Sequence, residues 1–243
     1  PMKGGDAREI YRGGTAGPID LPPGKRLVFI SESLSRPAEV YTIGTDGKDL
    51  RKLTSFNEEI LSGIEMGRVE EVTYAGFEDA DVQMFVLYPP GFDPSKKWPL
   101  LVLVHGGPHG TFGDDWHYRW NAQTFAAPGY VTVMVNFHGS SSFGQDFTDA
   151  LTGEVGRKPY EDVMKAADHL VAQGYIDEDR IAVAGGSYGG YLVSWIGTQT
   201  DRFACIVDHA GVFDLVAQFG SDITHGRARN YGGEPWDGLE AVT

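Results

Sequence analysis

Cysteine is nearly absent from this sequence. Cys205 is the only cysteine among 243 residues, so no disulfide can form within the chain. It stands in the apolar run 204–207, and we expect a small core residue there rather than a nucleophile. Cysteine usage therefore leaves the redox compartment undecided.

Basic residues are scarce as well. The chain has 20 Lys and Arg against 34 Asp and Glu, a formal net charge of −14. Nucleic acids and anionic membrane surfaces attract clustered Lys and Arg, so neither is expected as a partner. No apolar run approaches the ~20 residues of a membrane span, and residues 1–9 lack the apolar core of a signal peptide. We expect a soluble protein, with its compartment (cytoplasmic, periplasmic or secreted) undecided.

Glycine, in contrast, is concentrated around one serine. An apolar run at 181–184 is followed by Gly185, Ser187 and Gly189 in a Gly-x-Ser-x-Gly pattern, and then by a helix-like pattern from Tyr191 to Ile196. This order is typical of a nucleophile elbow, in which a strained turn between strand and helix lifts the serine oxygen above the end of a parallel sheet. Glycine permits the close passage of strand and helix. We predict that Ser187 is a nucleophile rather than part of a structural turn.

The chain from residue 67 onward alternates strand and helix patterns. Two alternating runs, 69–74 and 82–88, suit antiparallel strands. Continuous apolar runs, typical of parallel strands buried on both faces, occupy residues 100–104, 131–135, 181–184 and 204–207. Helices are expected over 116–127 and over 160–173, the second ending at Gly174. The pattern predicts an α/β sheet with the elbow after the fifth of six strands, as in the α/β-hydrolase fold.

The segment before residue 67 has a different pattern. Short antiparallel strands are expected at 26–30, 39–43 and 49–53, with a turn at Asp46-Gly47, a strong hairpin signal. Residues 57–67 suit a connector. Residues 38–54 resemble a strand pair of a β-propeller blade, and one blade cannot bury its apolar face alone. We therefore expect the chain to begin inside a longer protein.

A second glycine-rich loop, His105-Gly-Gly-Pro-His-Gly110, follows the third expected strand of the sheet. Attack on a carbonyl places negative charge on its oxygen, and each donor aimed at that charge is worth about 3 kcal/mol. We expect one donor to be the backbone N–H of Tyr188 and the other to come from this loop. His105 and His109 are four residues apart across a turn without a carboxylate, so no metal site is expected.

The serine also needs a base that a carboxylate holds in the right tautomer. The histidines after Ser187 are His209 and His225. Asp208 precedes His209, but adjacent residues at a strand end point in opposite directions, so Asp208 is poorly placed to orient it. We expect both histidines to be loop residues rather than the base. His117 and His169 are expected in helical stretches, at the surface or the edge of the core.

Six motifs occur in the order found in the prolyl oligopeptidase family and cover most of residues 67–238: His105-Gly-Gly-Pro-His-Gly110, Tyr118-Arg-Trp120, Asn136-Phe-His-Gly-Ser-Ser-Ser-Phe-Gly-Gln-Asp-Phe147, Lys158-Pro-Tyr-Glu-Asp-Val163, Gly185-Gly-Ser-Tyr-Gly-Gly-Tyr191 and Tyr231-Gly-Gly-Glu-Pro-Trp236. The chain resembles that family, and its acylaminoacyl-peptidase and dipeptidyl-peptidase V branch in particular.

The resemblance implies a last propeller blade and connector in residues 1–66 and an α/β-hydrolase catalytic domain, without its last strands, in residues 67–243. It makes Ser187 the nucleophile and the backbone of Tyr188 and Gly107 the oxyanion hole, with no cofactor. The implied reaction is acyl-enzyme hydrolysis of short peptides, which removes dipeptides or acylated residues from their N-termini.

Other residues are assigned by the resemblance in less detail. Tyr191, Trp195 and Phe143 are candidates for apolar substrate contact, with core packing as the alternative. Where the family commonly has Asn-x-Arg-Gly-Ser, this chain has His138, which can replace the arginine as a donor only in part. The family's acid and histidine have no counterpart up to Thr243, so we expect a fragment whose partner is the remainder of the same protein or another copy.

Two other functions stay open at this point. A carboxylesterase shares the elbow and the His-Gly-Gly loop, although the blade-like N-terminus disfavours it. A non-catalytic hydrolase-like module that binds a peptide or a partner protein would need no base.

Overall fold

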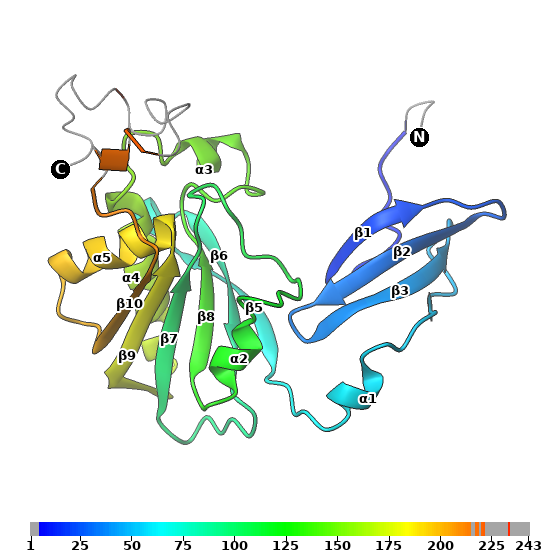
Figure 1. Ribbon diagram of the computed structural model, residues 1–243, viewed down its shortest axis with the longest axis horizontal. Helices are drawn as coiled ribbons and strands as arrows, with labels where there is room; N and C mark the ends of the chain where they lie inside the picture. The colour runs from blue at the N-terminus through cyan, green and yellow to red at the C-terminus, as the bar shows by residue number, and fades with distance from the viewer. Residues whose placement is uncertain (1–4, 215–216, 219, 222–232, 234–243) are drawn as a thin grey trace. The chain divides into compact units, whose positions relative to one another are not determined.

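The computed structural model describes residues 5–214, 217–218, 220–221 and 233 (Figure 1). The chain groups into two compact units, Pro1–Gly67 with Gly113–Gln123 and Arg68–Phe112 with Thr124–Thr243. His225 and all of the 231–236 motif except Gly233 lie outside the described residues. Within the described part, no helix has the length and apolar character needed to cross a membrane.

The first unit contains a four-stranded antiparallel sheet in the order β1-β2-β3-β4. Its strands are β1 (Thr15–Asp20), β2 (Arg26–Ser33), β3 (Arg36–Gly44) and β4 (Arg51–Lys52). The two strands expected at 26–30 and 39–43 are confirmed and run longer, whereas the third is only two residues long and β1 was not expected. A short helix, α1 (Glu58–Leu61), lies in the connector.

Residues 113–123 belong to the same unit, which sequence reasoning did not anticipate. Asp114 links them to the sheet: its carboxylate accepts a hydrogen bond from the backbone N–H of Leu34 at 2.8 Å, and its carbonyl accepts one from Thr15 at 2.9 Å. Backbone groups at the ends of β1 and β2 therefore find partners in this segment.

The helix expected over 116–127 is wrong in its first half. The Nδ1 of His117 accepts hydrogen bonds from the backbone N–H groups two and three residues later, which forms a local turn instead. Asn121 then accepts a bond from the N–H of Gln123 at 2.9 Å, as a helix-capping side chain does. The helix α2 therefore spans only Ala122–Ala126, and His117 is not helical.

The second unit is a six-stranded sheet in the order β10-β9-β7-β8-β6-β5. Its strands are β5 (Val69–Ala75), β6 (Asp81–Leu87), β7 (Trp98–Val104), β8 (Val131–Asn136), β9 (Ile176–Gly186) and β10 (Cys205–His209). The last four are parallel to one another, and β5 and β6 are antiparallel. The helical elements are η1 (Phe77–Asp79), α3 (Gln145–Asp149), α4 (Arg157–Val171) and α5 (Tyr188–Gln199). All six expected strands are confirmed, and the unit is an α/β structure.

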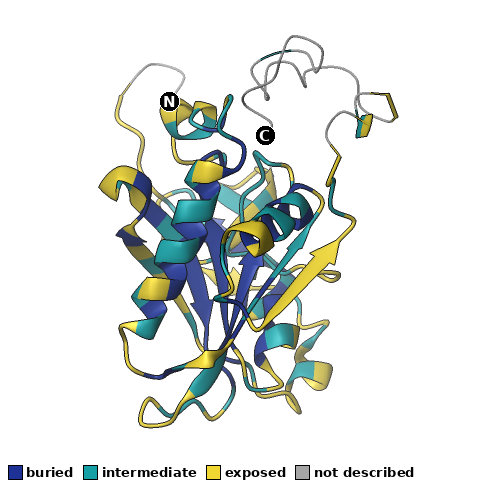
Figure 2. Ribbon diagram, turned by 90° about the vertical axis from the view of Figure 1, so that its left-hand side faces the viewer, coloured by how far each residue is buried: buried dark blue, intermediate teal, exposed yellow. Residues whose placement is uncertain are grey.

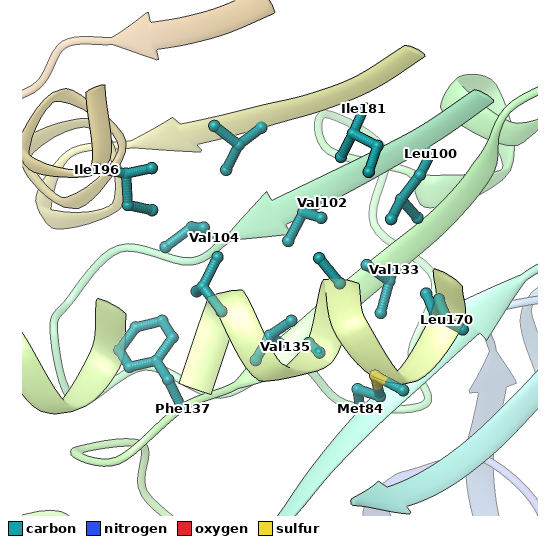
Figure 3. Packing of buried hydrophobic residues seen from close by; sticks show 14 of the residues in the cluster. Met84, Leu100, Val102, Val104, Val133, Val135, Phe137, Leu170, Ile181 and Ile196 are labelled. Atoms are coloured by element: carbon teal, nitrogen blue, oxygen red, sulfur yellow. The ribbon is translucent and has the colours of Figure 1, made fainter. Parts of the chain in front are cut away.

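The core of this unit is built from every second residue of the strands. Strand register aligns Val86, Val133, Val102 and Val183 in one row across β6, β8, β7 and β9, and all four are fully buried. Helices α4 and α5 add residues such as Leu170 and Ile196 to the same cluster (Figure 3). β-Branched side chains pack well on a pleated surface, so the valine-rich runs of these strands favour the strand conformation.

Strand β10 differs from the other parallel strands because it lies at the edge of the sheet. All five of its residues are exposed, whereas β7 and β8 are largely buried (Figure 2). The expectation that Cys205 is a core residue is therefore wrong: its side chain is exposed. An apolar run at an edge strand looks the same in sequence as one in the middle of the sheet.

Helix α4 has the buried face that its sequence predicts and carries one buried charge. Asp162 is fully buried, and its carboxylate accepts hydrogen bonds from the backbone N–H of Phe77, the backbone N–H of His138 and the His138 ring, each at 2.7 Å. His138 thus donates twice to the same carboxylate. Asp162 joins α4 to η1 and to the loop that follows β8.

We expect Asp162→Asn to lower the free energy of unfolding by about 3 kcal/mol, because an amide nitrogen would replace an acceptor that faces buried donors. Urea unfolding measures this loss. Asp168→Asn on the same helix is the control, since Asp168 is 64% exposed and pairs with Arg202 near the surface; its loss should stay below ~1 kcal/mol. Losses of equal size in the two variants would contradict the role of Asp162.

Candidate active site

Ser187 stands between the end of β9 and the start of α5, as the elbow pattern predicts. Its backbone has φ 59° and ψ −119°, a conformation that strains a residue with a side chain, and the residue is exposed. Its N–H donates to the carbonyl of His209 on β10 at 2.9 Å. A Cβ on Gly189 would collide with the Val104 carbonyl, and one on Gly185 with the Gly189 carbonyl. Glycine is thus required where α5 crosses the strands.

The His-Gly-Gly loop starts at the end of β7 and lies directly beside this turn. Val104 on β7 is in register with Gly185 on β9. A Cβ built on Gly106 would be 3.2 Å from the Cβ of Ser187 and 2.9 Å from the Gly186 carbonyl oxygen. Gly106 therefore lies against the serine turn.

The backbone N–H of Tyr188 is the other expected oxyanion donor. Tyr188 is the first residue of α5 and follows Ser187 directly. Its ring is buried, and its hydroxyl donates to the carbonyl of Val155. The position of Tyr188 is thus fixed from both its backbone and its side chain.

The loop after β7 is fastened to the loop after β8 by side chains. Asn136, the last residue of β8, accepts a bond from the N–H of Phe112 at 2.7 Å and donates to the Phe112 carbonyl at 2.9 Å. The ring of His109 donates from Nδ1 to the Gly139 carbonyl at 2.8 Å. In the sequence, the 136–147 motif indicated only a resemblance to the family, and no role was predicted for the Asn136 side chain. The signal that could have indicated its role is a polar residue at the end of an apolar strand.

His105 is a buried part of this arrangement. Its Nδ1 lies 2.9 Å from the Gly106 carbonyl oxygen, and its Nε2 lies 2.8 Å from the hydroxyl of Ser140. The ring stacks on Phe137 with centroids 4.2 Å apart and meets the edge of Phe112. Burial lowers the pKa of His105 to about 4, although the bond to the Gly106 carbonyl acts in the opposite direction. The imidazole is therefore neutral near pH 7.

The Nδ1 atoms of His105 and His109 do not face a common point. The first contacts the Gly106 carbonyl and the second contacts the Gly139 carbonyl. Among the described residues, no group of three or more His, Cys, Asp or Glu side chains is arranged to hold a metal ion.

Asp208 has a structural role instead of orienting its neighbour. Its carboxylate accepts bonds from the Gly211 N–H at 2.8 Å and from the Ser194 hydroxyl at 3.0 Å, which ties the end of β10 to α5. His209 supports the serine turn through its backbone carbonyl. His225 lies outside the described residues. The identity of the catalytic base stays a prediction.

The three candidate substrate contacts differ in their surroundings. Tyr191 and Trp195 are partly buried and pack against the core cluster of the second unit. Phe143 is 38% exposed and contacts the ring of Phe147 at a centroid distance of 5.5 Å. A substrate-contacting role stays a prediction for all three.

We expect stability to depend on pH through His105. Its pKa falls from 6.5 to about 4 on folding, so the unfolded chain binds the proton more tightly. The stabilisation is present above pH 6.5 and is lost as the pH falls towards 4, by about 3 kcal/mol in total. Urea unfolding of wild type and His105→Asn between pH 7 and pH 4.5 measures it. The free energy of unfolding should fall more in the wild type than in the variant as the pH is lowered. An equal fall in both proteins would contradict a lowered pKa of His105.

Comparison with known proteins agrees with the motifs. A family model described as the prolyl oligopeptidase family matches residues 116–242. A dipeptidyl-peptidase 5 of Aspergillus fumigatus is 35% identical over 230 residues, which cover 93% of this chain and 32% of that relative. The chain thus spans about a third of the length of the curated relatives it matches.

Solved structures give the same result. The acylaminoacyl peptidase of Pyrococcus horikoshii has a TM-score of 0.86 at 26% identity, covering 97% of this chain and 38% of that one. An acylaminoacyl peptidase in complex with Z-Gly-Gly-Phe-chloromethyl ketone has a TM-score of 0.84 at 27% identity, with 97% and 37% covered. Since the family model covers just over half of the sequence, the chain belongs to the prolyl oligopeptidase family.

Proposed function

We propose that this chain carries the nucleophile and the oxyanion hole of a serine peptidase that acts on short peptides. One observation supports the proposal above all: Ser187 is exposed in a strained turn, and Gly106 of the His-Gly-Gly loop lies against it. A strained conformation costs about 1–3 kcal/mol and persists only where the surroundings enforce it. Such strain at an exposed serine is expected where the serine hydroxyl must reach a substrate.

The proposed reaction proceeds through an acyl-enzyme. The Oγ of Ser187 attacks the peptide carbonyl carbon, and its proton passes to a base. The backbone N–H groups of Tyr188 and Gly107 stabilise the negative oxygen that forms. Collapse of the intermediate breaks the C–N bond, the amine leaves with the proton, and water then releases the acyl group by the reverse sequence. No cofactor takes part.

The base and its carboxylate partner are proposed to follow Thr243 in the full-length protein, in the order serine, acid, histidine of this fold. His209 and His225 are the alternatives within the chain. Asp208 is already engaged with Gly211 and Ser194, so it is not proposed as the acid.

The substrate class is proposed from the relatives. Their names describe dipeptidyl-peptidases and acylaminoacyl peptidases, and one structure holds a peptide chloromethyl ketone. We propose removal of dipeptides or acylated residues from peptide N-termini. The second unit is proposed to be the α/β-hydrolase domain, and the sheet of the first unit to be one propeller blade, since a blade has four strands.

Labelling of the full-length protein with a fluorophosphonate probe tests the nucleophile. We expect one label, on Ser187, located by mass spectrometry, and none in Ser187→Ala. His209→Ala and His225→Ala should label at the wild-type rate if the base lies elsewhere. A label that persists in Ser187→Ala, or wild-type protein that stays unlabelled, would overturn the proposal and favour a binding module.

The substrate class needs a separate measurement. We expect Ser187→Ala to lower kcat on a dipeptidyl or an N-acyl-aminoacyl amide by about 10⁴-fold or more. A simple p-nitrophenyl ester serves as the comparison. Rapid ester hydrolysis with no hydrolysis of either amide would indicate an esterase and contradict the peptidase assignment.

A further inference from the structure

We propose that Phe143 forms one wall of a subsite for an aromatic or large aliphatic side chain of the peptide substrate. The inference deepens the proposed function, because it names a specificity-determining residue of the same site, and it rests on the nucleophilic role of Ser187. It starts from the exposure of Phe143, which is 38% and lies in the loop after β8. Strand β8 is parallel to β7 and β9, so this loop and the serine turn lie at the same edge of the sheet.

The loop that carries Phe143 adjoins the glycine loop. Strand β8 is the neighbour of β7 on the side away from β9, so the glycine loop after β7 lies between the loop after β8 and the serine turn. The N–H of Ser141 donates to the Gly110 carbonyl at 3.2 Å, and the Oγ1 of Thr111 lies 2.8 Å from the Ser141 carbonyl oxygen. Phe143 follows Ser141 by two residues and is therefore close to the glycine loop.

A short peptide that is bound at Ser187 can reach this loop. Gly106 lies against Ser187, a Cβ on Gly110 would collide with the Gly106 carbonyl, and Gly110 is bonded to Ser141. Three direct contacts thus lead from the serine turn to the loop after β8. An extended peptide advances ~3.3 Å per residue, which is similar to the length of one such contact. Side chains near the scissile bond therefore lie within reach of Phe143.

The backbone immediately before Phe143 is strained. Ser142 is exposed and has φ 79°, in the left-handed region that a residue with a side chain rarely adopts. Such a conformation persists only where the surroundings enforce it, and the contacts of Ser141 with the glycine loop do so on one side. Strained residues are concentrated in ligand-binding and catalytic regions. The strain therefore favours a functional role for this loop over plain packing.

The ring of Phe143 is supported by other aromatic rings. It contacts Phe147 at a centroid distance of 5.5 Å, and Phe147 stacks on His138 at 4.4 Å. The His138 ring is itself held by the buried carboxylate of Asp162. Phe143 thus presents an apolar surface whose position is set before a ligand arrives. Preorganisation of this kind lowers the entropy cost of binding, and burial of an apolar side chain against the ring favours the complex.

Phe143→Ala in the full-length protein tests the subsite. The measured quantity is the ratio of kcat/KM for a substrate with phenylalanine to kcat/KM for its glycine counterpart. We expect the ratio to fall by about tenfold while the glycine substrate stays within about twofold of wild type, because only the larger side chain contacts the ring. Phe143→Leu should keep most of the ratio, since it keeps an apolar surface.

Tyr130→Ala is the matched control. Tyr130 is also 38% exposed, but it directly precedes β8 and therefore lies at the opposite edge of the sheet. Its variant should leave the ratio unchanged. Urea unfolding of both variants ensures that the kinetic comparison is made between folded proteins.

Two substrate series identify which residue of the peptide occupies the subsite. In the first, glycine or phenylalanine supplies the carbonyl that is attacked, with p-nitroaniline as the leaving group. In the second, the acyl part ends in alanine and the leaving group is glycinamide or phenylalaninamide. Each series uses the N-acyl-aminoacyl or the dipeptidyl form, whichever the wild type cleaves. A selective loss in either series supports the subsite and assigns it to that residue. An unchanged ratio in both series, or an equal loss for glycine and phenylalanine substrates, would overturn it.

Binding without turnover separates failure of this inference from failure of the proposed function. Ser187→Ala is titrated calorimetrically with N-acetyl-Phe-Phe-amide and with N-acetyl-Gly-Gly-amide. Adding Phe143→Ala should weaken the affinity for the first peptide by about tenfold and leave the second unchanged. If the wild type cleaves no peptide amide and Ser187 takes no label, the proposed function fails and the titration alone decides. Equal affinities for the Phe-Phe peptide with and without Phe143, or no binding of it, would then overturn the subsite.

Discussion

The hydrogen-bonded pairing of β7 with β8 on one side and β9 on the other is the constraint on which the site depends. Val104 is in register with Val135 and with Gly185, so three parallel strands end at one edge of the sheet. His105 follows Val104 directly, and Ser187 comes two residues after Gly185. The rows of buried valine that fix this register therefore also fix the separation of the serine turn from the glycine loop.

Beyond the strand ends, buried polar side chains provide the hydrogen-bond partners that neighbouring strands provide within the sheet. Loops have no ladder of backbone hydrogen bonds, so their buried N–H and C=O groups need other partners. Asn136, Asp162 and His105 supply these partners for the loops after β8 and β7 and for η1. Valines in the core can exchange for one another at modest cost. These three residues cannot, because their replacement leaves specific donors or acceptors unmatched.

The sequence predicts best what depends on local pattern. Hydrophobic periodicity predicts the strands of the second unit and the buried face of α4. The glycine spacing around Ser187 predicts the turn, because strand and helix pass close together there. The edge position of Cys205, the turn formed by the His117 ring and the burial of Asp162 depend on partners that are distant in the sheet or specific to one rotamer. An acidic residue on a helix is expected to be exposed unless hydrogen-bond donors from other elements face it, and the sequence does not show those donors.

The strain at Ser187 also gives the edge strand β10 a role in the site. The turn is held by the N–H of Ser187 donating to the carbonyl of His209, which is paired with Gly186 in the register of β9 and β10. Asp208 fastens the same strand end to α5. The strained conformation persists because these bonds and the buried side of α5 enforce it. A change that shifts β10 by one residue would therefore release the serine turn without altering Ser187 or the loop after β7.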